Sequence, residues 1–434
     1  SPSTLVILPV QDVFGWTDRI NVPATVAPDN WTFMLPWHSD RMTAIPEAGA
    51  AQGSTLEFFP LWSYAHPPAI ELAAKVASLA PGDLNRVFLT PTGGDAVESA
   101  IKFSRQYWKL MGRPTKHKVM SRYLSYHGTS MGALSLTGVP AIKQPFEPLV
   151  PGAVKVQTPY RYRCNDCMHL DGCTLRCADD LAMRIEMEGP ETVAAVFMEP
   201  VQNTGGAFTP PDGYWQRVRE ICDHYDVLLV SDEVIAAFGR FGHMFGSERY
   251  GYQPDLITFA KGVTSGYSPL GGMIVSDRLA EPFLADGNVF LQGQTFGAHP
   301  VSCAVANANL DLFEREDLCG HVLANETRFK SLVEGLLDIP IVGDVRGAGY
   351  FLAIELVPNK AIRATFTDEQ AEWLLRGVLS PKLFDAGLIC RADDRADPVV
   401  VLSPTLVAGE QELEFIRTIL RTAFTGAWKA LQER

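Results

Sequence analysis

Two carboxylates and a lysine follow short apolar runs in the middle of this chain. The run 226–230 is followed directly by Ser231, Asp232 and Glu233, and a second run, 255–260, is followed by Lys261. If both runs are neighbouring strands of an open α/β sheet, their carboxyl ends meet in the crevice where such sheets bind ligands. A lysine held there can form a Schiff base with a carbonyl compound.

Each of these residues has an ordinary explanation when it is taken alone. A lysine after a strand is usually a solvated loop end, and an Asp-Glu pair is usually a helix N-cap. The order of the whole series is more informative: Asp232-Glu233-Val234, Phe238-Gly239-Arg240, Pro254-Asp255, Lys261-Gly262 and Pro269-Leu270-Gly271-Gly272. This series resembles the class III aminotransferases, the ω-amino acid and amine transaminases, which are fold-type I enzymes dependent on pyridoxal 5′-phosphate (PLP).

The resemblance implies a role for each of the three charged residues at the strand ends. Lys261 would hold PLP as a Schiff base and then move a proton between the substrate carbon and the cofactor. Asp232 would stand beside the pyridine nitrogen and keep it protonated. Glu199, which follows the apolar run 193–198, would be a neighbouring or gating carboxylate.

The resemblance also implies which residues surround the cofactor ring and its phosphate. Tyr126, next to His127, matches the family's ring-stacking aromatic residue, although a lone tyrosine is more often part of the core; Val234 would press on the opposite face. Gly93 and Gly94 stand between a strand and a helix, where main-chain N–H groups can bind phosphate. The family usually has serine where Gly94 stands, so one side-chain contact to the phosphate is lost.

Substrate contacts and a shared site follow from the same resemblance. Phe58, Phe59 and Trp62 correspond to the aromatic wall of amine-accepting members, to which Trp31 or Phe33 could add. Arg391 aligns with the arginine that binds the acceptor's carboxylate, since a guanidinium suits a planar carboxylate; Arg395 is the competing candidate. Thr295 matches a threonine that reaches the phosphate of the neighbouring subunit, which implies a homodimer or a higher homo-oligomer.

A cysteine cluster is not part of this common machinery. Four of the eight cysteines, Cys164, Cys167, Cys173 and Cys177, lie in one short segment. In the expected cytosolic setting, clustered cysteines favour metal over disulfides, and thiolates suit an iron–sulfur cluster or zinc. We expect an iron–sulfur cluster slightly ahead of zinc; four reduced thiols, or partial disulfides, are the alternatives.

The elements that position these residues alternate between strands and helices, which is typical of a parallel sheet. Strands are expected at 86–90, 117–121, 193–198, 226–230, 255–260, 272–276 and 351–356, and helices at 96–111, 214–225, 301–315 and 410–431. The resemblance implies a fold-type I α/β architecture. Its large domain would span 56–300, with a mostly parallel sheet and a cysteine-rich insertion at 161–180. A smaller α+β domain would span 301–434, and residues 1–55 would join it at the pocket entrance.

Composition excludes several other classes of protein. The chain has 434 residues, of which 47% are hydrophobic and 20% charged, as in ordinary globular enzymes. The net charge of −13 disfavours nonspecific binding to nucleic acid or anionic membrane. No apolar run is long enough to span a membrane and no signal peptide is evident, so we expect a cytosolic protein.

Together these features predict a PLP-dependent transaminase that moves an amino group from an ω-amino acid or a primary amine to pyruvate or a similar keto acid by a ping-pong mechanism. An aminomutase, decarboxylase or epimerase of the same fold is the first alternative. A binding or structural subunit with the same fold is the second, and the intact Asp232 and Lys261 disfavour it.

Overall fold

The computed structural model describes residues 44–61, 64–167, 172–285, 287–393 and 395–434. The aromatic candidates Trp31, Phe33 and Trp62 lie outside the described residues, as does most of the expected N-terminal segment.

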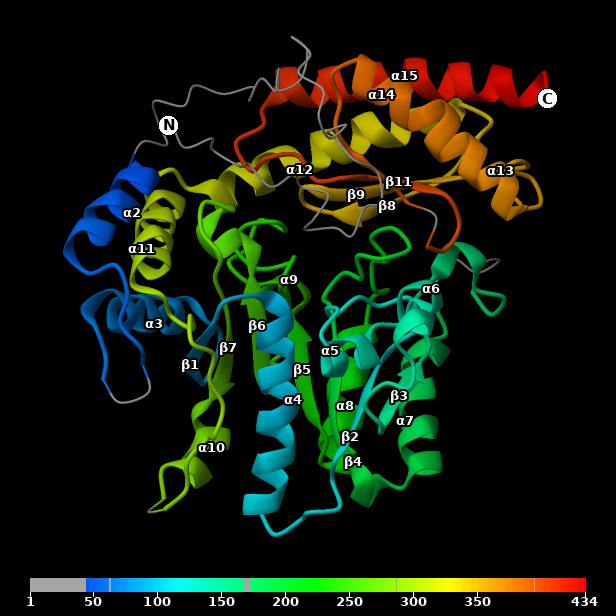
Figure 1. Cartoon of the computed structure of the whole chain (residues 1–434). Coiled ribbons are helices and arrows are strands. Elements are labelled where there is room, and N and C mark those ends of the chain that lie inside the picture. Colours follow the sequence, from blue (N-terminus) through cyan, green and yellow to red (C-terminus); the bar gives the residue numbers. More distant parts are fainter. Residues whose placement is uncertain (1–43, 62–63, 168–171, 286, 394) are drawn as a thin grey trace. The chain divides into compact units, whose positions relative to one another are not determined.

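A seven-stranded sheet carries the predicted site. Its strands are β1 (Leu84–Thr90), β2 (Lys118–Arg122), β3 (Ala153–Val156), β4 (Val193–Met198), β5 (Leu228–Asp232), β6 (Leu256–Ala260) and β7 (Gly271–Ser276). They lie in the order β1-β7-β6-β5-β4-β2-β3 (Figure 1). The strands from β6 to β3 pair in parallel, whereas β7 runs antiparallel to both β6 and β1. The mostly parallel sheet predicted from the sequence is confirmed.

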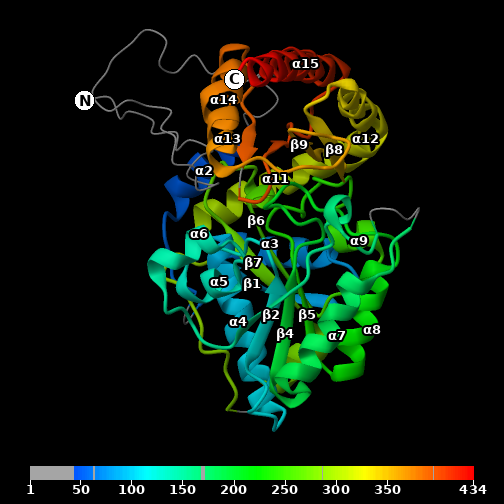
Figure 2. The same ribbon diagram turned by 90° about the vertical axis from the view of Figure 1, so that its right-hand side faces the viewer.

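Helices cover both faces of this sheet because its central strands are apolar on both sides. Successive side chains of a strand point to opposite faces, so Phe197 joins the hydrophobic cluster beneath α4 (Gly93–Leu110). Its neighbour Val196 joins the cluster beneath α7 (Arg176–Glu188) and α8 (Tyr214–Tyr225). Figure 2 shows α4 on one side of the strands and α7 and α8 on the other.

A smaller antiparallel sheet follows in the C-terminal part. Its strands are β8 (Val342–Ala348), β9 (Phe351–Leu356), β10 (Arg391–Asp393) and β11 (Val399–Leu402), in the order β10-β11-β9-β8. Four helices accompany it: α12 (Leu318–Glu334), α13 (Asp368–Glu372), α14 (Ser380–Asp385) and α15 (Glu410–Gln432). The amphipathic α15 buries Leu413, Leu420 and Phe424 in a cluster that also holds Ile354 of β9 and Val400 of β11. The smaller sheet with its helices confirms the predicted fold class.

The remaining helices connect these parts. They are α2 (Ala44–Thr55), α3 (Pro67–Leu79), α5 (Met131–Leu136), α6 (Pro140–Lys143), α9 (Gly246–Tyr250), α10 (Asp277–Ala280) and α11 (Pro300–Arg315). Helix α11 has Pro300 in its first turn and packs against α2 and α3. Within the described ranges, no helix is both long enough and apolar enough to cross a bilayer. The domain boundaries expected from the sequence stay a prediction.

Candidate active site

Four neighbouring parallel strands deliver predicted site residues to one edge of the large sheet. Asp232 is the last residue of β5, Lys261 follows β6 directly, and Glu199 follows β4. Strand β2 leads into the loop that carries His127. Because these strands run in the same direction, their carboxyl ends meet at the same edge. The sheet therefore brings together residues that are far apart in the sequence.

Three donors hold the carboxylate of Asp232, which is only 4% exposed. Its Oδ2 lies 2.7 Å from Nδ1 of His127, and a carboxylate accepts, so Nδ1 carries the proton. Its Oδ1 accepts from the main-chain N–H of Val234 at 3.2 Å and from the hydroxyl of Thr258 at 3.1 Å. This set of bonds fixes the orientation of a buried anion.

Lys261 interacts electrostatically with this anion. Burial lowers the pKa of Lys261 to about 8, while Asp232 and Glu199 oppose the shift and Arg391 adds to it. The residue has a φ of +47°, a left-handed conformation that is uncommon for lysine. A strained residue between a buried strand and a turn is typical of functional sites. The amine of Lys261 is therefore neutral at a lower pH than that of an ordinary lysine.

Glu199 lies beside this pair in a buried position. Its Oε1 accepts from the main-chain N–H of Tyr126 at 3.4 Å and of Asn203 at 3.5 Å. Its Oε2 lies 3.6 Å from NH2 of Arg122, which is also fully buried. Burial raises the pKa of Glu199, against the opposing effects of His127 and Arg122. Glu199 thus connects the loop that carries Tyr126 to the end of β4.

The predicted phosphate cradle lies at the N-terminus of α4, which begins at Gly93. Thr92 is the N-cap, and its hydroxyl accepts from the N–H of Asp95 at 3.2 Å. A Cβ on Gly93 would come within 2.8 Å of Val234, so only glycine allows this close approach. A Cβ on Gly94 would meet nothing nearer than Thr92 Oγ1 at 3.7 Å. The helix start is open at Gly94, and its dipole favours an anion there.

Arg391 is buried at the start of β10 and belongs to the same group. Its NH1 donates to Oδ1 of Asn203 at 3.2 Å, and its NH2 pairs with Asp393. It also interacts electrostatically with Tyr126 and Lys261. Burial lowers the pKa of Arg391, and Asp393 opposes this shift. Arg395 binds the same Asp393 through Nε at 2.9 Å and NH2 at 3.0 Å.

In the structure, Phe58 and Phe59 of the predicted aromatic wall contact other aromatic rings. Phe58 packs edge-on against Phe296, with ring centroids 5.6 Å apart, and lies 6.0 Å from the ring of His299. Phe59 contacts Tyr64 in the same way. Thr295 is exposed and directly precedes Phe296. The structure therefore places Phe58 against the segment that carries Thr295.

The four cysteines do not form a metal centre in the part of the chain that the structure describes. Cys167 Sγ lies 3.3 Å from Cys173 Sγ, but no group of three or more metal-ligating side chains occurs among the described residues. The expectation of an iron–sulfur cluster or zinc is therefore not supported.

Four site residues were not anticipated from the sequence: Thr258, Asn203, Asp393 and Arg122. Thr258 is the only polar residue of β6, and Arg122 is charged although it ends a buried strand. Asp393 stands two residues after Arg391, the spacing that puts two side chains on one face of a strand. Each of these signals was visible in the sequence. Asn203 carries no such signal, because its contact with Arg391 depends on the tertiary fold.

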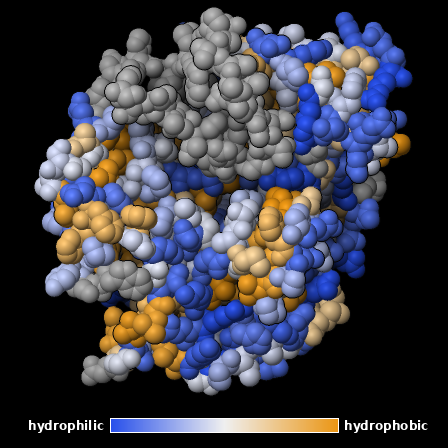
Figure 3. All heavy atoms as spheres, in the orientation of Figure 1, coloured by the Kyte–Doolittle hydropathy of each residue, from blue (hydrophilic) through white to orange (hydrophobic). Residues whose placement is uncertain are grey.

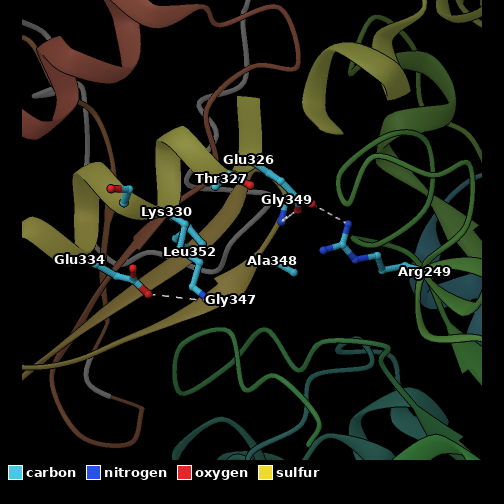
Figure 4. Close-up of a pocket in the computed structure, with 10 residues that line it drawn as sticks. Arg249, Glu326, Thr327, Lys330, Glu334, Gly347, Ala348, Gly349 and Leu352 are labelled. Carbon is cyan, nitrogen blue, oxygen red and sulfur yellow. Dashed lines mark hydrogen bonds and ion pairs between the residues drawn. The ribbon is translucent and has the colours of Figure 1, made fainter. Parts of the chain in front are cut away.

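A hollow of about 350 Å³ lies apart from these residues, between α12 and the turn from β8 to β9 (Figure 4). Its cations are already paired. Arg249 binds Glu326 at 2.9 Å and Lys330 lies 3.9 Å from Glu334. The N–H of Gly349 donates to Glu326 at 3.1 Å. The hollow contains none of the predicted site residues.

Comparison with known proteins agrees with the family predicted from the sequence. Residues 40–424 match the family described as aminotransferase class III. A probable aminotransferase of Mycobacterium tuberculosis is 57% identical over 88% of this chain and 82% of its own length. The putrescine–pyruvate aminotransferase of Pseudomonas aeruginosa is 36% identical over 96% of this chain and 89% of its own length. The crystal structure of an (S)-enantioselective ω-transaminase from Thermomicrobium roseum is 40% identical, covers 88% of this chain and 84% of its own, and has a TM-score of 0.83.

Proposed function

Since this chain belongs to the class III aminotransferase family of PLP-dependent enzymes, we propose that it moves an amino group from an ω-amino acid or a primary amine to pyruvate or a similar keto acid. The observation that carries the proposal is the meeting of Lys261, Asp232 and Glu199 at one sheet edge. Two similar proteins point to the same substrates, since one is named a putrescine–pyruvate aminotransferase and the other an ω-transaminase.

The residues present fit PLP. Among the described residues, Nε2 of His127 is buried without a hydrogen-bond partner, so a polar group remains for a ligand. Lys261 and Asp232 would hold the reactive carbon and the ring nitrogen, and Tyr126 and Val234 would enclose the ring. The N–H groups of α4 at Gly93 and Gly94 would bind the phosphate, and Thr295 would reach the phosphate of a neighbouring subunit.

The cofactor, when bound, supplies an aldehyde for the amino group and a protonated ring that accepts electrons from the substrate carbon. Asp232 is the charge that keeps the ring nitrogen protonated, because a fixed anion stabilises a nearby cation. The amine of Lys261 would be the base that takes up and gives back the proton of the substrate carbon. Its lowered pKa suits this work, since a proton carrier acts best near the working pH.

Arg391 is the acceptor's binding group in this proposal. A planar guanidinium binds a carboxylate through two parallel hydrogen bonds, so it favours a keto acid over a simple ketone. Asn203 and Asp393 hold Arg391 in place, and Nε of Arg391 is buried without a hydrogen-bond partner in the described structure. The donor amine lacks a carboxylate near its nitrogen and therefore needs apolar contacts, which Phe58 and Phe59 would supply.

We further propose a homodimer in which the segment around Thr295 meets the partner subunit. Exposed apolar side chains cluster along this segment: Leu284 is 69% exposed, Leu291 78% and Phe296 59%. Figure 3 shows hydrophobic residues gathered at the lower left, over the region labelled α10 in Figure 1. Exposed apolar patches of this kind mark interaction surfaces. Phe58 packs on Phe296 and would belong to the same interface.

Borohydride reduction followed by peptide mapping tests the central assignment. We expect the pyridoxyl group on Lys261 alone, and no labelled peptide in Lys261→Ala. A pyridoxyl group on another lysine would contradict the proposal. Product analysis with an amine, with and without added pyruvate, separates the alternatives. A transaminase forms product beyond one equivalent only when pyruvate is present. Its double-reciprocal plots of initial rate against amine concentration, taken at several pyruvate concentrations, are parallel lines, as a ping-pong mechanism requires.

A further inference from the structure

A buried turn follows β4 and carries Asn203, the residue that bonds Arg391. The turn spans residues 202–208, and main-chain hydrogen bonds of 3.0 Å and 2.9 Å between Gln202 and Phe208 close it. All of its residues are buried. Because water does not reach these residues, the main-chain carbonyls at the tip of the turn need donors from the protein.

Arg346 of β8 supplies these donors. Its Nε donates to the carbonyl of Gly206 at 2.6 Å, and its NH2 donates to the carbonyl of Gly205 at 2.9 Å. The guanidinium also lies over the ring of Phe208, 4.7 Å from the ring centroid. The planar fork of an arginine reaches two carbonyls at once, which the single ammonium of a lysine does not.

Two carboxylates hold the guanidinium of Arg346 from the other side. Its NH1 bonds Glu355, which is fully buried, at 2.6 Å, and Asp344 at 2.9 Å. Glu355 in turn accepts from Nε of Arg163 at 2.9 Å, and the hydroxyl of Tyr160 lies 2.5 Å from it. A buried anion with several donors has a fixed position, so Arg346 is fixed as well.

Arg346 and Arg391 stand at opposite ends of one row of residues across the smaller sheet. The strand pairing places Arg391 opposite Val401, Val401 opposite Ala353, and Ala353 opposite Arg346. Residues directly opposite one another in antiparallel strands point to the same face of a sheet. Val401 and Ala353 pack in one hydrophobic cluster with Ala207 of the turn. This face of the sheet therefore covers the turn, with one arginine at each end of the row.

We propose that Arg346 is a positioning residue for the keto acid, because it fixes the tip of the 202–208 turn and so holds Asn203 where Asn203 orients Arg391. The inference rests on the role proposed above for Arg391, the binding of the acceptor's carboxylate. Arg346 acts through the turn, and its own donors are occupied by the turn and the two carboxylates.

The path from the tip of the turn to Arg391 is short. The main-chain N–H of Gly206 donates to the carbonyl of Asn203 at 3.1 Å, so a shift of the tip moves Asn203. Oδ1 of Asn203 accepts from NH1 of Arg391 at 3.2 Å. A small displacement of a binding group is enough to weaken the orientation of a substrate. Loosening the tip should therefore reduce the use of pyruvate.

Arg346→Lys in the PLP-loaded enzyme tests the proposal, since it keeps a positive charge beside Glu355 but does not reach both carbonyls. We expect kcat/KM for pyruvate to fall about tenfold, the effect of a misplaced binding group. With propanal, an acceptor without a carboxylate, kcat/KM should stay within about twofold, because Arg391 makes no ionic contact with it.

Arg163→Lys is the matched control. Arg163 bonds the same Glu355, but its other partners, Asp397 and the carbonyl of Arg363, lie outside the turn. We expect a similar fall in the thermal unfolding midpoint in both variants and an unchanged preference for pyruvate over propanal in Arg163→Lys. Equal losses for the two acceptors in Arg346→Lys, or the same loss of preference in Arg163→Lys, would overturn the proposal.

A double variant tests the route through Asn203. Asn203→Ala should lower kcat/KM for pyruvate, and the addition of Arg346→Lys should lower it no further, because effects along one path are not additive. Two effects that multiply would overturn the proposal. If Arg346→Lys does not fold, Arg346→Met combined with Glu355→Gln replaces it, since this pair removes both buried charges together, and the same results are expected.

Arg391→Gln separates a failure of this inference from a failure of the proposed function. If Arg391→Gln loses activity with pyruvate selectively and Arg346→Lys does not, the inference is wrong and the acceptor role of Arg391 stands. If Arg391→Gln affects pyruvate and propanal equally, the acceptor role itself is wrong, and the inference about Arg346 is overturned with it.

Discussion

At the level of single residues, the hydrogen bonds of Asp232 indicate a substitution that tests its charge separately from its shape. Asp232→Asn keeps the shape of the side chain and its acceptor for Val234 and Thr258 but removes the charge. We expect turnover to fall by about 100-fold or more, a typical loss for one preorganised electrostatic contact. The thermal unfolding midpoint and the amount of bound PLP check that the fold persists. Near-normal turnover in this variant would contradict the role assigned to Asp232.

The lowered pKa of Lys261 predicts a pH profile. Only the neutral amine adds to an aldehyde, and a pKa of about 8 makes about a tenth of the lysine neutral at pH 7, far more than for an ordinary lysine. The rate of PLP uptake by the apoenzyme should therefore rise with pH and level off above pH 8. Glu199 raises the pKa of Lys261, so Glu199→Gln should move the midpoint to lower pH. Glu71→Gln, an exposed change on α3, is the control and should leave it in place. A midpoint near pH 10 would exclude the shift.

The role proposed for Arg391 predicts that its substitution changes the KM for the keto acid more than the KM for the amine. Arg391→Gln removes a charged hydrogen-bond donor to the keto acid, so KM for pyruvate should rise by about tenfold to a hundredfold, the effect of losing 1.5–3 kcal/mol. The KM for a hydrophobic amine should change less than threefold. Arg395→Gln is the matched variant, because Arg395 binds the same Asp393. A larger effect in Arg395→Gln would transfer the role to Arg395.

At the level of elements, the two adjacent glycines at the start of α4 have different surroundings. Gly93→Ala places a methyl group 2.8 Å from Val234, and overpacking of this kind costs about 1–3 kcal/mol. Gly94→Ser enters open space and regains the hydroxyl common in the family. We expect urea unfolding of the apoenzyme to show lower stability for Gly93→Ala and no loss for Gly94→Ser. Slower PLP dissociation is expected in Gly94→Ser. Equal stability of the two variants would contradict the packing argument.

The ends of helices and strands show where local sequence signals suffice. The strand 193–198 and the helix 214–225 have the predicted bounds, because a buried strand is apolar throughout and an amphipathic helix repeats every 3.6 residues. The predicted helix 96–111 begins earlier, at Gly93, since Thr92 caps it and includes both glycines in its first turn. Strand β7 was expected, but its antiparallel direction was not, because direction depends on its neighbours β6 and β1.

At the level of the whole molecule, the exposed apolar segment predicts an oligomer that would complete the proposed site. Leu291→Asp places a charge where a partner would bury an apolar side chain, so gel filtration should show a shift towards monomer. Activity should fall with it, because Thr295 would no longer reach the neighbouring phosphate. Met187→Asp is the matched control, since Met187 on α7 is 70% exposed but lies on another element. An unchanged dimer in Leu291→Asp would contradict this interface.

The sequence by itself determined the family and the strand runs, and it led to the proposal that Lys261 and Asp232 are the central site residues. These signals are local, because the motif is nearly continuous in the sequence and the apolar composition of each strand predicts its burial. The tertiary structure decided what these residues touch. Arg391 meets Asn203, 188 positions away, only because the smaller sheet brings β10 to the loop after β4. The pKa of Lys261 and the bonds of Asp232 likewise depend on burial and on neighbours from other strands, which no local pattern contains. The cysteine cluster shows the same limit, because its spacing predicted a metal, whereas no group of three or more metal-ligating side chains occurs among the described residues.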